Sequence, residues 1–244
     1  MKTKFLIFSN AAFLSKASLC EQSIRAFYSS EDYEISIVLY DSKMIKNSRY
    51  LEGLAFERIK AVRAELGQYD CVVLLGADCY LYHTLDSLFA VPGRIVLVPH
   101  VVTPPREAAR YYRTGFANGD VICFRKDAIQ IVDWLLTQPM RLQIGRGMFF
   151  EQTLLSCLPF IFDGIGICKD PAINYAYYNF YERQLEFING QFFISGKPLV
   201  LCQFSGYING FPERIGRYYK GLMPPEPVLA LFRQYENNLA LSPK

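Results

Sequence analysis

The chain has 244 residues, of which 51% are apolar and 20% charged, the balance of a globular protein that can bury a substantial core. Its 26 basic and 23 acidic residues are interspersed and leave a net charge of +3, which excludes a polybasic surface for nucleic acid or an anionic membrane. Its seven cysteines have no CxxC spacing and several stand in apolar runs, which predicts reduced, buried thiols and a cytoplasmic protein.

The first twenty residues imitate a signal peptide that ends at Leu19-Cys20, but Ser9, Asn10 and Lys16 interrupt the apolar region. We therefore expect no secretion signal. No apolar run has the length of a membrane-spanning helix, so any membrane contact is expected to be peripheral.

Alternating strand and helix patterns run through the first half of the chain, which predicts a mostly parallel sheet covered by helices, an α/β fold. Strands are expected at 4–9, 33–40 and up to Asp78, with helices at 14–29 and 51–66 between them. The second half is more irregular and rich in aromatic residues. It predicts helices at 85–88, 128–137, 148–158 and in the tail around Leu231, and strands at 93–101, 121–124, 191–194 and 199–204. We find no internal repeat or linker and expect one domain over 1–244.

The most informative stretch is the apolar run 71–77, which ends at a single acidic residue, Asp78. A strand buried on both faces has this composition, and in open α/β sheets ligands bind beyond the carboxyl ends of the strands. Asp78 could hold a metal or a substrate hydroxyl there. The alternative is an acidic residue that caps a turn or the next helix.

Glu151 is a second candidate, either a catalytic carboxylate or part of a solvated helix face. His83 and His100 are the only histidines, and without a partner motif each is expected to be structural.

The order of four segments carries a resemblance. Gly76-Ala77-Asp78 is followed by Gly115 to Val121, then Glu151-Gln152, then Gln203 to Tyr207. This order resembles GT-A glycosyltransferases of the glycogenin and bacterial lipopolysaccharide galactosyltransferase type, and Asn174 and Asn179 add to the likeness. The resemblance implies a GT-A-like fold, a nucleotide-sugar donor, and a glycan, lipid-linked or protein acceptor.

The resemblance also implies roles for individual residues. Asp78, with Gln203 at the position of the family's histidine, would hold Mn²⁺ or Mg²⁺, and Glu151 would face the sugar's anomeric carbon. The remaining implied contacts to the donor are Phe8, Ser9, Asn10, Asp41, Asn118, Gln152, Ser205 and Gly206.

The chain departs from the family pattern at two positions that bear on the same ion. Gly76 replaces the first acidic residue of the Asp-x-Asp motif, and Gln203 replaces the histidine. Fewer charged ligands weaken cation binding, so either the metal ion is bound weakly or basic side chains stabilise the leaving diphosphate. The candidates for that second role are Arg58, Lys60, Arg63, Arg214, Arg217 and Lys220.

The sequence therefore predicts a glycosyltransferase. The alternative is a catalytically silent nucleotide-binding or scaffold protein with the same fold, because the missing acidic and histidine positions are compatible with lost activity. A nucleotidyltransferase is disfavoured, since residues 8–12 after the first strand contain no glycine to form a phosphate loop.

Overall fold

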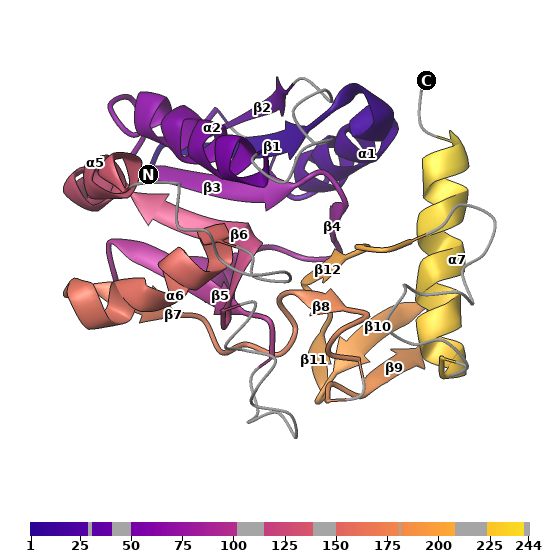
Figure 1. The fold of residues 1–244 in the computed structure, drawn as a ribbon. Coiled ribbons are helices and arrows are strands. Elements are labelled where there is room, and N and C mark those ends of the chain that lie inside the picture. The colour runs from indigo at the N-terminus through magenta and orange to yellow at the C-terminus, as the bar shows by residue number, and fades with distance from the viewer. Residues whose placement is uncertain are drawn as a thin grey trace.

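The computed structural model describes residues 1–28, 31–40, 50–101, 115–138, 150–180, 182–207 and 224–241; for residues 50–54, 150 and 151 it describes the backbone alone. A six-stranded sheet forms the centre of the molecule (Figure 1). Its strands, in spatial order, are β2 (Tyr33–Leu39), β1 (Thr3–Ser9), β3 (Cys71–Gly76), β6 (Ala117–Arg125), β5 (Ile95–Pro99) and β7 (Ile165–Ile167).

The sheet is mostly parallel, with β6 as the exception. β1 pairs in parallel with β2 and β3, and β5 with β7, whereas β6 runs antiparallel to both β3 and β5. Because β6 runs the other way, its first residues lie at the edge where β1 and β3 end. That edge is where an open α/β sheet binds ligands.

Helices cover both faces of the sheet because its central strands are apolar on both sides. In β3, Val73 and Leu75 pack toward α1 (Leu14–Arg25), whereas Val72 and Leu74 face the opposite core. That second core is closed by α2 (Tyr50–Glu65), α5 (Ile129–Thr137) and α6 (Phe150–Ile161). The α/β fold class predicted from the sequence is confirmed.

Two small sheets and the last helix form the elaborated second half (Figure 1). The tail helix α7 packs on this half through Tyr235, whose ring stacks on Phe204 with centroids 3.7 Å apart. The elements are β4 (Cys79–Leu81), β12 (Leu201–Gln203) and β8 (Tyr175–Ala176) in one sheet, β11 (Lys197–Pro198), β10 (Gln191–Ile194) and β9 (Leu185–Ile188) in the other, and α7 (Glu226–Leu241).

Three predicted boundaries were wrong. The predicted strand at 121–124 begins at Ala117, because the backbone of the turn-rich segment before it pairs with Pro99 across a bulge. β3 ends at Gly76, and Asp78 lies in the two-residue turn before β4. Pro159 lies inside the last turn of α6 and does not close the helix, although it lacks the amide that would donate to the carbonyl of Leu155.

The remaining predicted helices and strands have counterparts in the structure, including short α3 (Asp86–Phe89), although several ends shift by a few residues. The predicted helix at 14–29, for example, ends at Arg25. All seven cysteines are free thiols; six are buried as predicted, and Cys157 is exposed. Within the described ranges, no helix combines the length and the apolar character needed to cross a membrane.

Candidate functional site

Asp78 lies at the carboxyl edge of the sheet, between β3 and β4, as the sequence predicts. Its carboxylate accepts a hydrogen bond from the Ser205 hydroxyl at 2.9 Å, and its carbonyl accepts one from the Phe204 amide at 2.8 Å. Ser205 follows β12, which pairs with β4, and Gly206 turns the chain there with φ of 77°. Phe204 and Ser205 are therefore brought against Asp78.

A second carboxylate, Asp120, lies at the same edge and was missed in the sequence interpretation. Arg58 Nη2 lies 3.0 Å from Asp120 Oδ1, and Arg58 also donates to the carbonyl of Gly119. Gln203 Nε2 donates to Asp120 Oδ2 at 2.5 Å. The acidic residue shortly after Asn118 was visible in the sequence, but only the pairing of β6 with β3 shows that it reaches this edge.

Buried amides hold Gln203 in one orientation. Its Oε1 accepts hydrogen bonds from Asn118 Nδ2 at 2.9 Å and from the Tyr178 hydroxyl at 2.7 Å, so its amino group points to Asp120. Asn118 is 1% exposed, also donates to Asn174, and accepts a hydrogen bond from the Asp120 amide at 2.7 Å. These contacts use both polar ends of each amide and immobilise the base of the site.

The charges at this edge are coupled. Burial and the nearby charge of Asp120 raise the pKa of Asp78 to about 6, against a partial lowering by Ser205 and Lys16. Burial lowers the pKa of the Lys16 ammonium, which Asp78 opposes. Lys16 also lies over the ring of Tyr207, 5.5 Å from its centroid. Two carboxylates and two basic side chains thus share one small region.

The predicted nucleotide-pocket residues at the end of β1 lie beside Arg58. The ring of Phe8 stacks on Tyr40 with centroids 5.8 Å apart, and the Arg58 guanidinium lies 6.0 Å from the Phe8 centroid. Asn10 accepts from the Phe13 amide, so it caps the short helix η1 (Ala11–Phe13), and it donates to the Tyr40 hydroxyl. The Ser9 hydroxyl donates to the carbonyl of Asn10. Asp41 lies outside the described residues.

Glu151 and Gln152 occupy the first turn of α6. This turn docks on the start of β6, because the Ser156 hydroxyl donates to the Gln152 carbonyl and accepts from the Phe116 and Ala117 amides. Gln152 is half-buried, and the side chain of Glu151 lies outside the description.

The basic side chains predicted to stabilise the leaving diphosphate differ in where they lie. Arg58 is buried, whereas Lys60 and Arg63 point outward on α2, where Arg63 pairs with Asp133 on α5. Arg214, Arg217 and Lys220 lie outside the described residues.

Several polar residues of the second half have structural contacts. Asn179 donates to the carbonyls of His100 and Asn174, and buried Arg183 donates to the carbonyls of Ile173 and Asn174. Asn174 itself adopts a left-handed backbone with φ of 63°. His83 is exposed and bonds Thr84.

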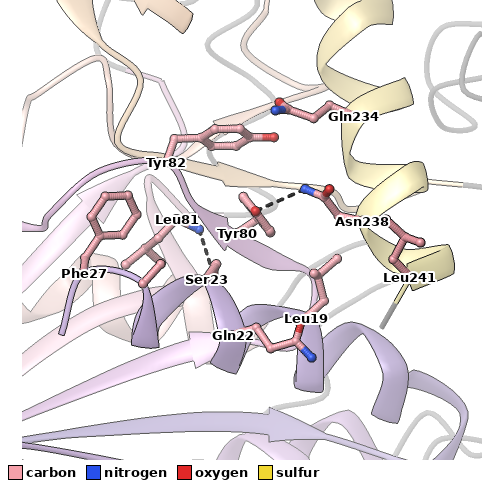
Figure 2. Close-up of a pocket in the computed structure, with 11 residues that line it drawn as sticks. Leu19, Gln22, Ser23, Phe27, Tyr80, Leu81, Tyr82, Gln234, Asn238 and Leu241 are labelled. Atoms are coloured by element: carbon pink, nitrogen blue, oxygen red, sulfur yellow. Dashed lines mark hydrogen bonds between the residues drawn. The ribbon is translucent and has the colours of Figure 1, made fainter. Parts of the chain in front are cut away.

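A separate cleft of about 390 Å³ lies between α1, β4 and α7 (Figure 2). Aromatic rings, aliphatic side chains and amides line it, and its described lining contains no charged side chain. Tyr80 accepts a hydrogen bond from Asn238 at 3.1 Å within it. This described lining suits a neutral ligand better than a diphosphate.

Among the described residues, no cluster of three or more histidine, cysteine or acidic side chains is placed to hold a metal ion. Of the described residues, Asp78 and Asp120 bring carboxylates to the sheet edge, and their oxygens are the hard donors that Mg²⁺ and Mn²⁺ prefer. A site of two carboxylates fits a cation that takes its remaining ligands from phosphate and water.

The fold is shared with solved glycosyltransferases. The galactosyltransferase LgtC, solved in complex with donor and acceptor sugar analogs, is 10% identical, with a TM-score of 0.56 over 99% of this chain and 98% of that one. A glycosyltransferase involved in glycosylation of the major capsid of PBCV-1 is 12% identical, with a TM-score of 0.54 over 85% of this chain and 95% of that one.

The glycosyltransferase GlyE of Streptococcus pneumoniae is 13% identical, with a TM-score of 0.55; the match covers 98% of this chain and 62% of that protein. No family model matches the sequence, and no curated protein matches it. The GT-A-like fold expected from the sequence is confirmed by these structures.

Proposed function

We propose that this chain is a glycosyltransferase that moves a sugar from a nucleotide-diphosphate sugar to a glycan, lipid-linked or protein acceptor. One observation carries the proposal: Asp78, Asp120 and Arg58 converge at the ligand-binding edge of a fold that a donor- and acceptor-binding galactosyltransferase shares over 98% of its length. Six buried thiols fit a reducing cytoplasm, where we place the protein.

The donor's nucleotide is proposed to lie at the end of β1. The stacked rings of Phe8 and Tyr40 offer an apolar wall beside the Arg58 guanidinium, which suits a molecule that joins an aromatic base to a diphosphate. Ser9 and Asn10 shape this wall through their contacts with the backbone and with Tyr40. Asp41, which lies outside the described residues, stays a predicted contact of the donor.

The leaving diphosphate gains negative charge as the glycosidic bond breaks, and the edge must stabilise it. Mn²⁺ or Mg²⁺ held at Asp78 would supply positive charge there. Among the described residues, Arg58 and Lys16 place positive charge beside these carboxylates. The Ser205 hydroxyl orients Asp78. Because its amide is engaged at both ends, we propose that Gln203 positions Asp120 and does not itself bind the ion.

The sugar is proposed to lie between this edge and the first turn of α6. Glu151 would stabilise the positive charge that develops at the anomeric carbon, and Gln152 would bond a sugar hydroxyl. Asn118 keeps the base of the site in place through Gln203 and the Asp120 amide. Its proposed role is therefore positioning.

The first experiment is a thermal-shift screen of UDP-, GDP-, CMP- and dTDP-sugars with and without Mn²⁺. A ligand that binds only the folded chain at 100 times its Kd stabilises it by about 2.7 kcal/mol, which a melting curve detects. Turnover of the donor that binds is then measured.

Asp78→Ala and Glu151→Ala should each abolish turnover while the melting temperature stays near that of the wild type. Asp133→Ala, which removes an exposed carboxylate on α5, is the matched control and should keep full activity. If both site variants keep full activity, the site assignment is wrong. If no nucleotide-sugar binds or is turned over, the proposed function is wrong.

A further inference from the structure

The antiparallel pairing of β3 and β6 places Asp120 across from Gly76. Leu75 pairs with Val121, so Gly76 and Asp120 are the next residues outward at the sheet edge. A Cβ atom added to Gly76 would lie 2.9 Å from both Cβ and Cγ of Asp120, closer than real Cβ atoms approach other atoms. The Asp120 side chain therefore occupies the space that a side chain at position 76 would need.

Two donors from one short segment bond the Asp120 and Asp78 carboxylates, one each. Gln203 and Ser205 are alternate residues of one segment, and Gln203 donates to Asp120 while Ser205 donates to Asp78. The Asp120 side chain keeps 28% of its surface exposed, so an ion from solvent can reach it. A carboxylate offers about four lone-pair positions, and Arg58 and Gln203 use two of those on Asp120.

We infer that Asp120 and Asp78 together bind a divalent cation, Mn²⁺ or Mg²⁺, with Asp120 supplying from β6 the carboxylate that Gly76 does not supply from β3. The inference rests on the proposed function for its purpose, since the ion would take its remaining ligands from the donor diphosphate and water. Mg²⁺ sites of one or two carboxylates plus substrate phosphates are common. Arg58 offsets one negative charge of the pair when no ion is bound.

The test is a titration of the purified chain with Mn²⁺, followed by the electron paramagnetic resonance signal of the free ion, with and without added UDP or GDP. Asp120→Asn keeps the shape of the side chain and an oxygen that Arg58 and Gln203 can still bond. We expect this variant and Asp78→Asn each to weaken Mn²⁺ binding by about tenfold or more. The exposed-carboxylate control Asp133→Asn should bind as the wild type does.

A swap of the two side chains gives a second measurement that does not depend on loss alone. Asp120→Gly should lose Mn²⁺ affinity, and Gly76→Asp added to it should restore the affinity, because the space beside position 76 is then open. Gly76→Asp alone should lower the melting temperature, since its side chain meets Asp120.

The inference is overturned if Asp120→Asn binds Mn²⁺ as tightly as the wild type. It is also overturned if the wild type binds no Mn²⁺ at millimolar concentration with either nucleotide, which would leave Asp120 as the ion-pair partner of Arg58. Turnover of a nucleotide-sugar in EDTA at the full rate contradicts a metal ion bound by the two carboxylates and leaves the proposed function standing. Mn²⁺ binding through both carboxylates without any turnover supports the pair and contradicts the function.

Discussion

Replacing Arg58 with methionine probes the ion pair at the centre of the site. The Arg58 side chain is 9% exposed, its Nη2 lies 3.0 Å from Asp120 Oδ1, and it also donates to the carbonyl of Gly119. Methionine keeps an unbranched stem of similar length beside Phe8 but removes the charge and the donors. The variant therefore leaves Asp120 without its buried cation.

The expected loss of stability follows from the exposure of the two partners. Removing one partner of a fully buried pair costs about 3–5 kcal/mol. Because Asp120 remains 28% exposed, water compensates in part, and we reduce the cost to about 2 kcal/mol. The Gly119 carbonyl adds about 1 kcal/mol for its lost donor. At about 2–4 °C per kcal/mol for a chain of this size, the melting temperature should fall by roughly 6–12 °C.

The assay is thermal and urea unfolding of the metal-free chain, with Arg63→Met as the matched control. Arg63 pairs with Asp133 on the surface, with side chains 37% and 51% exposed, so its loss should cost less than about 1 kcal/mol. A combined Arg58→Met and Asp120→Asn variant should lose less than the sum of the two single changes, because the residues are coupled. Equal losses for the two arginine variants, or simple additivity in the pair, would refute the reasoning.

Two further predictions concern Asp78 and the docking of α6. The pKa of Asp78 is raised to about 6, so the Asp78 carboxyl binds its proton more tightly in the folded chain than in the unfolded chain. The free energy of unfolding in EDTA should therefore fall as pH rises from about 4 to about 6. Asp78→Asn should lessen this fall, and urea unfolding curves with the same pH dependence in both proteins would contradict it. Gly115→Ala should cost about 2–4 kcal/mol, since φ is +74° and the new Cβ would overlap the carbonyl of Gln152. Gly67→Ala, with no heavy atom within 4 Å of its Cβ, is the control; similar melting temperatures for both variants would count against the close contact.

The fold was largely predictable because its signals are local. The strand 71–76 has no polar side chain because both of its faces are buried. Helices with apolar stripes must cover both faces of a sheet made of such strands. Asp78 could be placed at the carboxyl edge for the same reason. The start of β6 was not predictable, since Gly115, Asn118 and Gly119 favour turns and only the neighbouring strands draw this segment into the sheet.

The candidate cations show where sequence reasoning stops. Arg58, Lys60 and Arg63 lie on one helix within six positions and are equally basic. At 3.6 residues per turn, positions 60 and 63 lie about 200° and 140° around the helix from position 58, so Arg58 faces the sheet edge and the other two face away from it. The sequence alone does not state which face of α2 meets the site, because that depends on how α2 packs on the sheet.

The sequence by itself determined the α/β class, the order of strands and helices along the chain, and a carboxylate at the end of β3, because each depends on the pattern of neighbouring residues. Only the tertiary structure decided which strand lies beside β3 and in which direction it runs. That pairing places Asp120, more than forty positions away, beside Gly76, and so brings a carboxylate to an edge position where β3 has none. Strand neighbours are selected by the packing of the whole sheet, so no local motif could have shown it.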